Sequence, residues 1–339
     1  MNHNVIGLDI AKQVFHLVEL NNHGKVIRKK KLRRKQLRQY FAKIQPCIVA
    51  MEACASSHYW GREFEKLGHQ VTLLPAQHVK AFVRGNKNDY NDALAIAEAR
   101  RFDNIRPVGI KTVEQQSIQA IHRLRRSVIG DRTALCNQIH GLLGEFGIII
   151  NKGISSLKKM IPDILEDGEN ELNDMFRAAL ELKYQQLLQL NELIDKFNKM
   201  IQENAKKHKA IQLLQTIPGY GVINSSQYYC VVGDGKAFKN GRGVSASLGI
   251  VPRQHSSGGK DTLLGISKRG DKYLRSLLIH GARSVVRQAH KKDDKLSRWV
   301  TRLVEKRGKN KATVALANKL ARIGWAVITS GKPYEASYA

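Results

Sequence analysis

The chain has 339 residues, 42% of them hydrophobic, which is enough for about two domains with substantial cores. Its 57 lysines and arginines exceed its 29 acidic residues by a formal net charge of +28, so a polyanionic partner is expected, with nucleic acid first and an anionic membrane surface second. No apolar run reaches the roughly 18 residues of a membrane-spanning helix, and the four cysteines form no C-x-x-C pair, which argues against a zinc site or a disulfide framework and fits a reducing cytoplasm.

The first hundred residues alternate between strand and helix signals. The predicted strands are 5–10, 14–20, 24–32, 47–52 and 70–74, and the predicted helices are 33–44, 56–67 and 88–101, with a further helix opened by Pro75. Three antiparallel strands followed by strands that helices separate indicate an α/β sheet of the ribonuclease-H type rather than an all-parallel sheet.

The pattern changes after Thr112. Long helices are predicted over 113–146 and 171–207, whereas 151–167 mixes Gly, Pro and Ser with short apolar stretches and receives no regular element. The two long helices predict an antiparallel pair or an oligomer-forming coiled coil. A Gly-rich, basic third part begins near residue 211, with helices predicted at 271–290, 295–307 and 311–329. The chain is therefore divided into 1–110, 111–210 and 211–339.

Four acidic residues occupy related positions in the first part. Asp9 lies inside the strand V-I-G-L-D-I, where an ionised carboxylate loses hydration worth several kcal/mol unless a partner replaces the water. Glu52 ends the fourth strand, which in a ribonuclease-H-type sheet lies beside the first, and Asp89 and Asp92 share one face of a helix start. Singly, the helix acids fit dipole compensation and Glu52 fits a solvated strand end. Together they predict a Mg²⁺ site, with two ions about 3.5–4 Å apart clamping a phosphodiester.

A strongly basic run follows the third strand. A charge run is ordinarily a solvated face, but beside a nuclease-type sheet phosphate contact is favoured, and each neutralised phosphate adds about one unit to the log–log salt slope. Aromatic residues make up only 6% of the chain, so stacking on single strands is not expected to dominate. The candidate nucleic-acid-binding residues here are Arg28, Lys29, Lys30, Lys31, Arg33, Arg34 and Lys35.

Two later stretches also predict phosphate contact. I-P-G-Y-G is similar to a helix-hairpin-helix turn, in which Gly219 and Gly221 let backbone N–H groups approach a phosphate, although such turns also occur as plain loops. V-P-R-Q-H-S-S-G-G-K presents an accessible serine among cationic residues, and its simpler interpretation is a Gly-Ser loop that only binds phosphate. The cationic candidates in and after this stretch are Arg253, His255, Lys260, Lys268 and Arg269.

At this point the sequence resembles the DEDD transposases of the insertion-sequence family numbered one hundred and ten, relatives of the Piv invertase, and most of all its H-S-S-G-G-K subgroup. The resemblance covers essentially the whole chain through motifs in the family's order: G-L-D-I-A-K, M-E-A-C, N-K-N-D-Y-N-D-A, T-V-E-Q-Q, I-P-G-Y-G, F-K-N-G-R and V-P-R-Q-H-S-S-G-G-K. It implies a RuvC-like N-terminal domain, a long helical linker and a mostly α-helical C-terminal transposase domain.

The resemblance also implies the chemistry. Asp9, Glu52, Asp89 and Asp92 fall on the family's Mg²⁺-binding tetrad, and Ser257 falls on its catalytic serine, with the neighbouring Ser256 as the one ambiguity. That serine attacks a DNA phosphate and forms a phosphoserine link that a second strand resolves. A structured bridge RNA that pairs with donor and target DNA is implied, as is a homo-oligomer, dimer to tetramer, with composite active sites and no membrane. A bacterial cytoplasmic, nucleoid-associated location follows.

Two rival functions differ from this recombinase in what a single variant does. In a RuvC-like structure-specific nuclease that uses water, Ser257→Ala leaves activity intact. In a non-enzymatic nucleic-acid-binding protein, Asp9→Ala leaves the molecular function unchanged. A covalent protein–DNA adduct separates all three functions.

Overall fold

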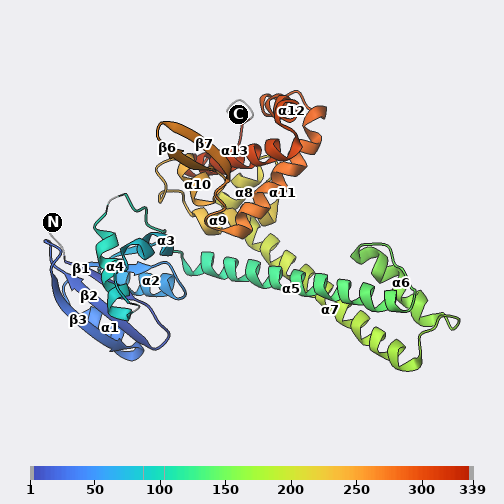
Figure 1. Ribbon diagram of the computed structural model, residues 1–339, viewed down its shortest axis with the longest axis horizontal. Coiled ribbons are helices and arrows are strands. Elements are labelled where there is room, and N and C mark those ends of the chain that lie inside the picture. Colours follow the sequence, from blue (N-terminus) through green and yellow to red (C-terminus); the bar gives the residue numbers. More distant parts are fainter. Residues whose placement is uncertain (1–3, 87, 103, 336–339) are drawn as a thin grey trace. The chain divides into compact units, whose positions relative to one another are not determined.

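The computed structural model describes residues 4–86, 88–102 and 104–335 (Figure 1). The chain forms two compact units, an N-terminal unit of Met1–Gln115 with Val232–Lys239 and a C-terminal unit of Gln116–Val231 with Asn240–Ala339. Within the described residues, no helix combines the length and apolar character needed to cross a membrane.

The N-terminal unit is built on a five-stranded mixed sheet. Its strands are β1 (Val5–Asp9), β2 (Val14–Leu20), β3 (Val26–Arg33), β4 (Ile48–Glu52) and β5 (Gln70–Leu74), in the spatial order β3-β2-β1-β4-β5. β1, β2 and β3 pair antiparallel, whereas β4 is parallel to both β1 and β5. This confirms the predicted mixed sheet, and it confirms that the strand ending in Glu52 lies beside the strand carrying Asp9.

Helices cover both faces of this sheet because its central strands carry apolar residues on both faces. One face packs against α1 (Arg34–Lys43) and α2 (Ser57–Lys66), through a core that includes Leu8, Leu17 and Phe64. The other face packs against α4 (Asp89–Arg100), through Val18 and the small residues of that helix. The short α3 (Ala76–Val79) and the 3₁₀ turn η1 (Lys80–Phe82) connect β5 to α4.

The long-helix region consists of α5 (Val113–Glu145), α6 (Ile154–Glu166) and α7 (Asp174–Lys207), which share one apolar core. No element was predicted over 151–167, and the structure shows that 154–166 is helical and contains Pro162. A proline inside a helix costs about 3 kcal/mol. The helix buries Leu157, Ile161 and Ile164 at helical spacing, and at about 1.5–3 kcal/mol each this burial outweighs that cost.

Among the described residues, the remainder of the C-terminal unit consists of helices, their connections and one hairpin. The helices are α8 (Lys209–Gln215), α9 (Val222–Val232), α10 (Gly241–Ser247), α11 (Lys272–Gln288), α12 (Lys295–Arg307) and α13 (Lys309–Ser330), with a 3₁₀ turn η2 (Ala289–Lys291). α13 packs against α8, α10, α11 and α12. The three predicted C-terminal helices are confirmed. The serine stretch, predicted as a Gly-Ser loop in its simpler interpretation, instead forms strands β6 (Pro252–Ser257) and β7 (Lys260–Ile266).

Candidate active site

Two of the predicted acids lie at adjacent strand ends. Asp9 is the last residue of β1 and Glu52 is the last residue of β4. The parallel register pairs Leu8 with Met51, so the next residue on each strand is one of the two acids. Residues at matching positions of adjacent strands point to the same face of a sheet. Asp9 and Glu52 therefore share the face on which α4 packs.

The other two acids lie in the first turn of α4. The side chain of Asn88 caps this helix by accepting a hydrogen bond from the Tyr90 amide at 2.9 Å, so the aspartates are not needed as caps. Asp89 and Asp92 are both in the first turn, where the helix dipole favours negative charge. The three elements β1, β4 and α4 thus bring all four acids to one region of the N-terminal unit.

The electrostatics of the cluster follow from this crowding. Burial, reinforced by the charges of Asp92 and Asp89, raises the pKa of Asp9 to about 6. Burial and the charge of Asp92 also raise the pKa of Glu52. The ionised forms of Asp9 and Glu52 are therefore destabilised by burial and by the neighbouring carboxylates. A divalent cation relieves such repulsion, and carboxylate oxygens suit a hard ion such as Mg²⁺, so the four acids fit the metal that the sequence predicts.

His16 is part of this region and was missed by the sequence analysis. It is 7% exposed, and its Nδ1 lies 3.2 Å from Asp89 Oδ2. One ligand atom from each of Asp9, His16 and Asp89 lies within 4.8 Å of the others. The register pairs Asp9 directly with His16. The signal in the sequence was the short connection 10–13, since a tight link between antiparallel strands determines which residues face each other.

The predicted serine lies in the β6–β7 hairpin. Gly258 and Gly259 form its two-residue turn, with φ values of 56° and 77°, as a type I′ turn requires. The register pairs Ser256 with Asp261 and Ser257 with Lys260. The Ser256 hydroxyl donates to Asp261 Oδ1 at 2.6 Å. Side chains alternate along a strand, so Ser257 faces the side of Lys260, away from that carboxylate.

The remaining cationic candidates of the C-terminal unit are exposed. Arg253 and His255 lie on β6, and Lys260 begins β7. Lys268 and Arg269 follow β7, and their backbone is held in place: the Lys268 amide donates to the Gly249 carbonyl at 3.1 Å. Lys268 has a φ of 57°, an unusual left-handed conformation for a residue other than glycine.

The two glycines of I-P-G-Y-G have different environments. Gly219 has a φ of 82°, and a Cβ added there would come within 2.7 Å of the Gly281 carbonyl oxygen on α11. Its lack of a side chain is therefore required by backbone conformation and by helix packing. Gly221 is exposed just before α9, and no atom lies within 4 Å of an added Cβ. Of the two, Gly221 has the more open backbone for a phosphate.

The basic run is distributed over two elements. Arg28, Lys29, Lys30, Lys31 and Arg33 lie on the edge strand β3, whereas Arg34 and Lys35 begin α1. All seven residues are exposed. The acids and this run belong to the N-terminal unit, and the serine hairpin belongs to the C-terminal unit.

A mixed sheet that gathers carboxylates at adjacent strand ends, followed by a helical C-terminal part, has the features of a DEDD nuclease-like domain joined to a helical domain. Two protein-family models match this chain: one described as "Transposase" over residues 6–148, and one described as "Transposase IS116/IS110/IS902 family" over residues 211–297.

Individual relatives match over nearly the full length. The chain is 44% identical over 330 residues to a probable family 20 transposase of Pseudomonas aeruginosa, covering 97% of this chain and 98% of the relative. It is 43% identical to the transposase for insertion sequence element IS1111A of Coxiella burnetii, covering 97% and 91%. A pilin gene-inverting protein of Moraxella lacunata is 34% identical over 128 residues, which are 36% of this chain and 38% of that protein. The chain therefore belongs to the IS116/IS110/IS902 family of transposases, which are enzymes of DNA transposition.

Proposed function

We propose that this transposase cuts and rejoins DNA strands through a phosphoserine intermediate formed by Ser257, with Mg²⁺ held by Asp9, Glu52, Asp89 and Asp92 in a RuvC-like domain. The observation that carries the proposal is the convergence of the four acids from β1, β4 and α4, with the pKa of Asp9 raised to about 6. Mutually repelling carboxylates at a site of DNA chemistry are best explained by a cation that they bind together.

The acids act by holding metal and substrate together. Asp9 and Asp92 are central in this role, because the charge of Asp92 raises the pKa of both strand-end acids. Magnesium bound there, as two ions, supplies positive charge that stabilises the developing negative charge on the transferring phosphoryl group. His16, which lies on β2, holds Asp89 at the start of α4 in position.

The covalent step uses the hydroxyl of Ser257. Its oxygen attacks the phosphorus and loses its proton, and the bond from phosphorus to a deoxyribose oxygen breaks, leaving a protonated hydroxyl on the departing strand. A hydroxyl of a second strand then attacks the same phosphorus and releases the serine. Each exchange conserves the number of phosphodiester bonds, so rejoining needs no ATP. One observation favours Ser257 over Ser256: Ser257 is paired with Lys260, whose positive charge stabilises the phosphoryl group under attack.

We propose that a structured bridge RNA selects the donor and target DNA by base pairing. The net charge of +28 supports a nucleic-acid partner. Exposed apolar residues on α7 support a homo-oligomer, dimer to tetramer, in which the acids of one protomer serve the serine of another. These residues are Met175, Leu182, Leu193 and Met200.

The functional division that we propose is 1–110, 111–210 and 211–339. The protein acts at the nucleoid in the bacterial cytoplasm.

The test is to trap the adduct. The protein is purified with RNA transcribed from the noncoding flank of its gene and is incubated with Mg²⁺ and nicked suicide duplexes that carry the element's junction. Wild type and Ser256→Ala are expected to form a covalent protein–DNA species on a denaturing gel, whereas Ser257→Ala forms none. DNA cleavage without any adduct, unchanged in Ser257→Ala, would refute the serine step and establish the water-dependent nuclease instead.

A further inference from the structure

The basic run on β3 is divided by the pleat of the strand into two faces. Residues directly opposite on antiparallel strands share a face. Lys31 is paired with His16, and Lys29 with Val18, so both lysines lie on the face of the sheet that carries α4 and the acids. Lys30 is paired with Leu17, which lies in the core under α1 and α2.

The cations on the α1 and α2 face are engaged within the protein. Arg28 Nε lies 3.5 Å from Glu19 Oε2, and its Nη1 donates to the Tyr40 hydroxyl at 3.1 Å. The ammonium of Lys30 lies 4.7 Å from the centre of the Tyr40 ring. Arg34 at the start of α1 is similarly engaged, 5.2 Å from the centre of the Trp60 ring.

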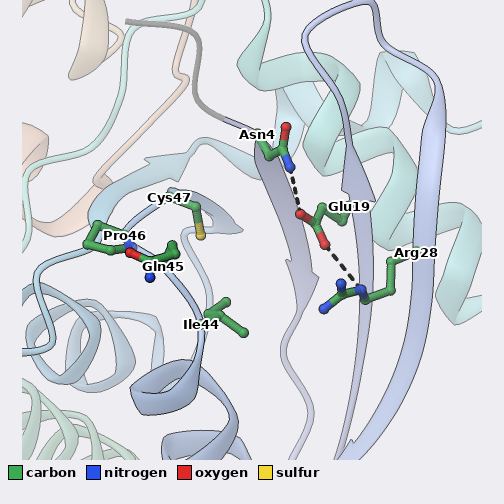
Figure 2. A pocket seen from close by; sticks show the side chains of 7 residues that line it. All are labelled: Asn4, Glu19, Arg28, Ile44, Gln45, Pro46 and Cys47. Carbon is green, nitrogen blue, oxygen red and sulfur yellow. Dashed lines mark hydrogen bonds and ion pairs between the residues drawn. The ribbon is translucent and has the colours of Figure 1, made fainter.

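Figure 2 shows Arg28 turned toward Glu19, which also accepts a hydrogen bond from Asn4 at 2.9 Å. These residues line a pocket of about 380 Å³. Asn4 precedes β1, whereas Asp9 ends that strand, so the pocket and the acids lie at opposite ends of β1. Arg28 therefore belongs to a structural contact remote from the acid cluster.

Lys29 and Lys31 differ from these cations in two respects: their side chains are not engaged within the protein, and they lie on the face that carries the acid cluster. Both are exposed, and among the described residues the side chain of neither has a hydrogen-bond or ion-pair partner, although both backbones pair with β2. The row Asp9–His16–Lys31 crosses three neighbouring strands, so the Cα atoms of Asp9 and Lys31 are about 10 Å apart. Lys29 is two residues, about 7 Å, further along the same face. This separation is comparable to that between successive phosphates of a nucleic-acid strand.

We infer that Lys29 and Lys31 form a phosphate-binding row that holds the DNA strand beside the acid cluster, whereas Arg28, Lys30 and Arg34 of the same run are structural. The inference rests on the proposed function, because it assumes that the acid cluster acts on a DNA phosphodiester. DNA is the expected occupant, rather than the guide RNA, because the row leads directly to the site where DNA is cut. Lysines on an edge strand also discourage edge-to-edge pairing, which is the competing explanation for these residues.

The experiment measures binding of a fluorescent mixed-sequence DNA duplex by the full-length protein in EDTA, over a range of salt concentrations. Lys29→Gln/Lys31→Gln is expected to lower the log–log salt slope by about 2, because each lost phosphate contact removes about 0.9 for duplex DNA. The matched control Lys25→Gln/Lys43→Gln removes two exposed positive charges from the same unit and is expected to leave the slope unchanged. Lys30→Gln alone is expected to change it by less than half a unit.

Equal slopes for the two double variants would overturn the inference, as would a slope change with an RNA hairpin but not with DNA. Self-association of Lys29→Gln/Lys31→Gln on sizing, with an unchanged slope, would establish the edge-protection role instead. Failure of the proposed function is distinguishable, because it is read from the Ser257 adduct with Mg²⁺ present. If Lys29→Gln/Lys31→Gln lowers the salt slope but wild type forms no adduct, the phosphate-binding row is supported and the serine mechanism is refuted.

Discussion

Gly7 lies so close to Ala97 that a Cβ added to the glycine would come within 2.6 Å of the Ala97 amide nitrogen. Gly7 is in the middle of β1, two residues before Asp9, and Ala97 is on the face of α4 that packs on the sheet. The absence of a side chain at residue 7 therefore sets how closely α4 approaches β1. It also sets the distance from Asp9 to the aspartates in the first turn of that helix.

Gly7→Ala is expected to cost about 2–3 kcal/mol of unfolding free energy, because overpacking forces the backbone apart. It is also expected to weaken Mn²⁺ binding, measured by calorimetry, because α4 and its acids move away from Asp9. Gly130→Ala on α5 is the control, since an added Cβ there meets nothing within 4 Å, and it should leave metal binding unchanged. Equal metal affinity in Gly7→Ala and wild type would contradict this role for the glycine.

Asp9→Asn is expected to stabilise the metal-free protein at pH 7.5. The pKa of Asp9 is raised from 3.8 to about 6 in the folded state, so the folded state binds more protons than the unfolded state between these values. The stability contributed by protonated Asp9 is thus lost as pH rises through this window. Asp9 is partly solvated, so after allowance for screening the gain in the variant is about 1 kcal/mol.

The measurement is urea denaturation of wild type and Asp9→Asn in EDTA at pH 4 and pH 7.5. The stability difference should be present at pH 7.5 and nearly absent at pH 4. Magnesium should raise the Tm of wild type but not of the variant. A difference that is the same at both pH values would show that Asp9 does not titrate in this window.

Gly219→Ala and Gly221→Ala test whether packing requires a glycine at residue 219 but not at residue 221. Gly219→Ala combines a left-handed backbone with a clash against the Gly281 carbonyl, and is expected to cost about 3 kcal/mol. Gly221→Ala meets no neighbour and should change stability by less than about 0.5 kcal/mol. Thermal unfolding measures both. Similar losses in the two variants would rule out the packing explanation for Gly219.

His122 predicts an acid-sensitive step in the C-terminal unit. It is fully buried, its Nε2 lies 3.0 Å from the Ser226 hydroxyl, and burial lowers its pKa from 6.5 to about 4. The neutral form is favoured in the folded state, so stability falls as pH decreases from 6.5 to 4, by about 3 kcal/mol in total. This sign is opposite to that of Asp9 in the overlapping range.

The check is the stability of wild type and His122→Gln at pH 7, 6 and 5. The wild type should lose more stability than the variant over this range, because glutamine does not titrate while its amide can still contact Ser226. A variant that loses as much stability as wild type would show that another group carries the acid sensitivity.

The strands of the N-terminal sheet and most of the helices followed from the sequence. Alternating apolar residues in β1 and β2 and 3–4 spacing in α7 are local patterns, and a backbone with such a pattern has few ways to bury it. The adjacency of Asp9 and Glu52 also followed, because a ribonuclease-H-type strand order brings their strands together. Pro162 shows the limit of local rules, since tertiary burial of α6 outweighed its cost.

Other features were decided by tertiary structure alone. The contact of His16 with Asp89, the approach of Gly7 to Ala97 and the division of the basic run into two faces all depend on which residues face each other across strands and helices. Hydrophobic pattern specifies that a face is buried, but not which partner covers it. Register and close packing are set by the whole unit, because each strand position is stabilised by neighbours that are distant in sequence.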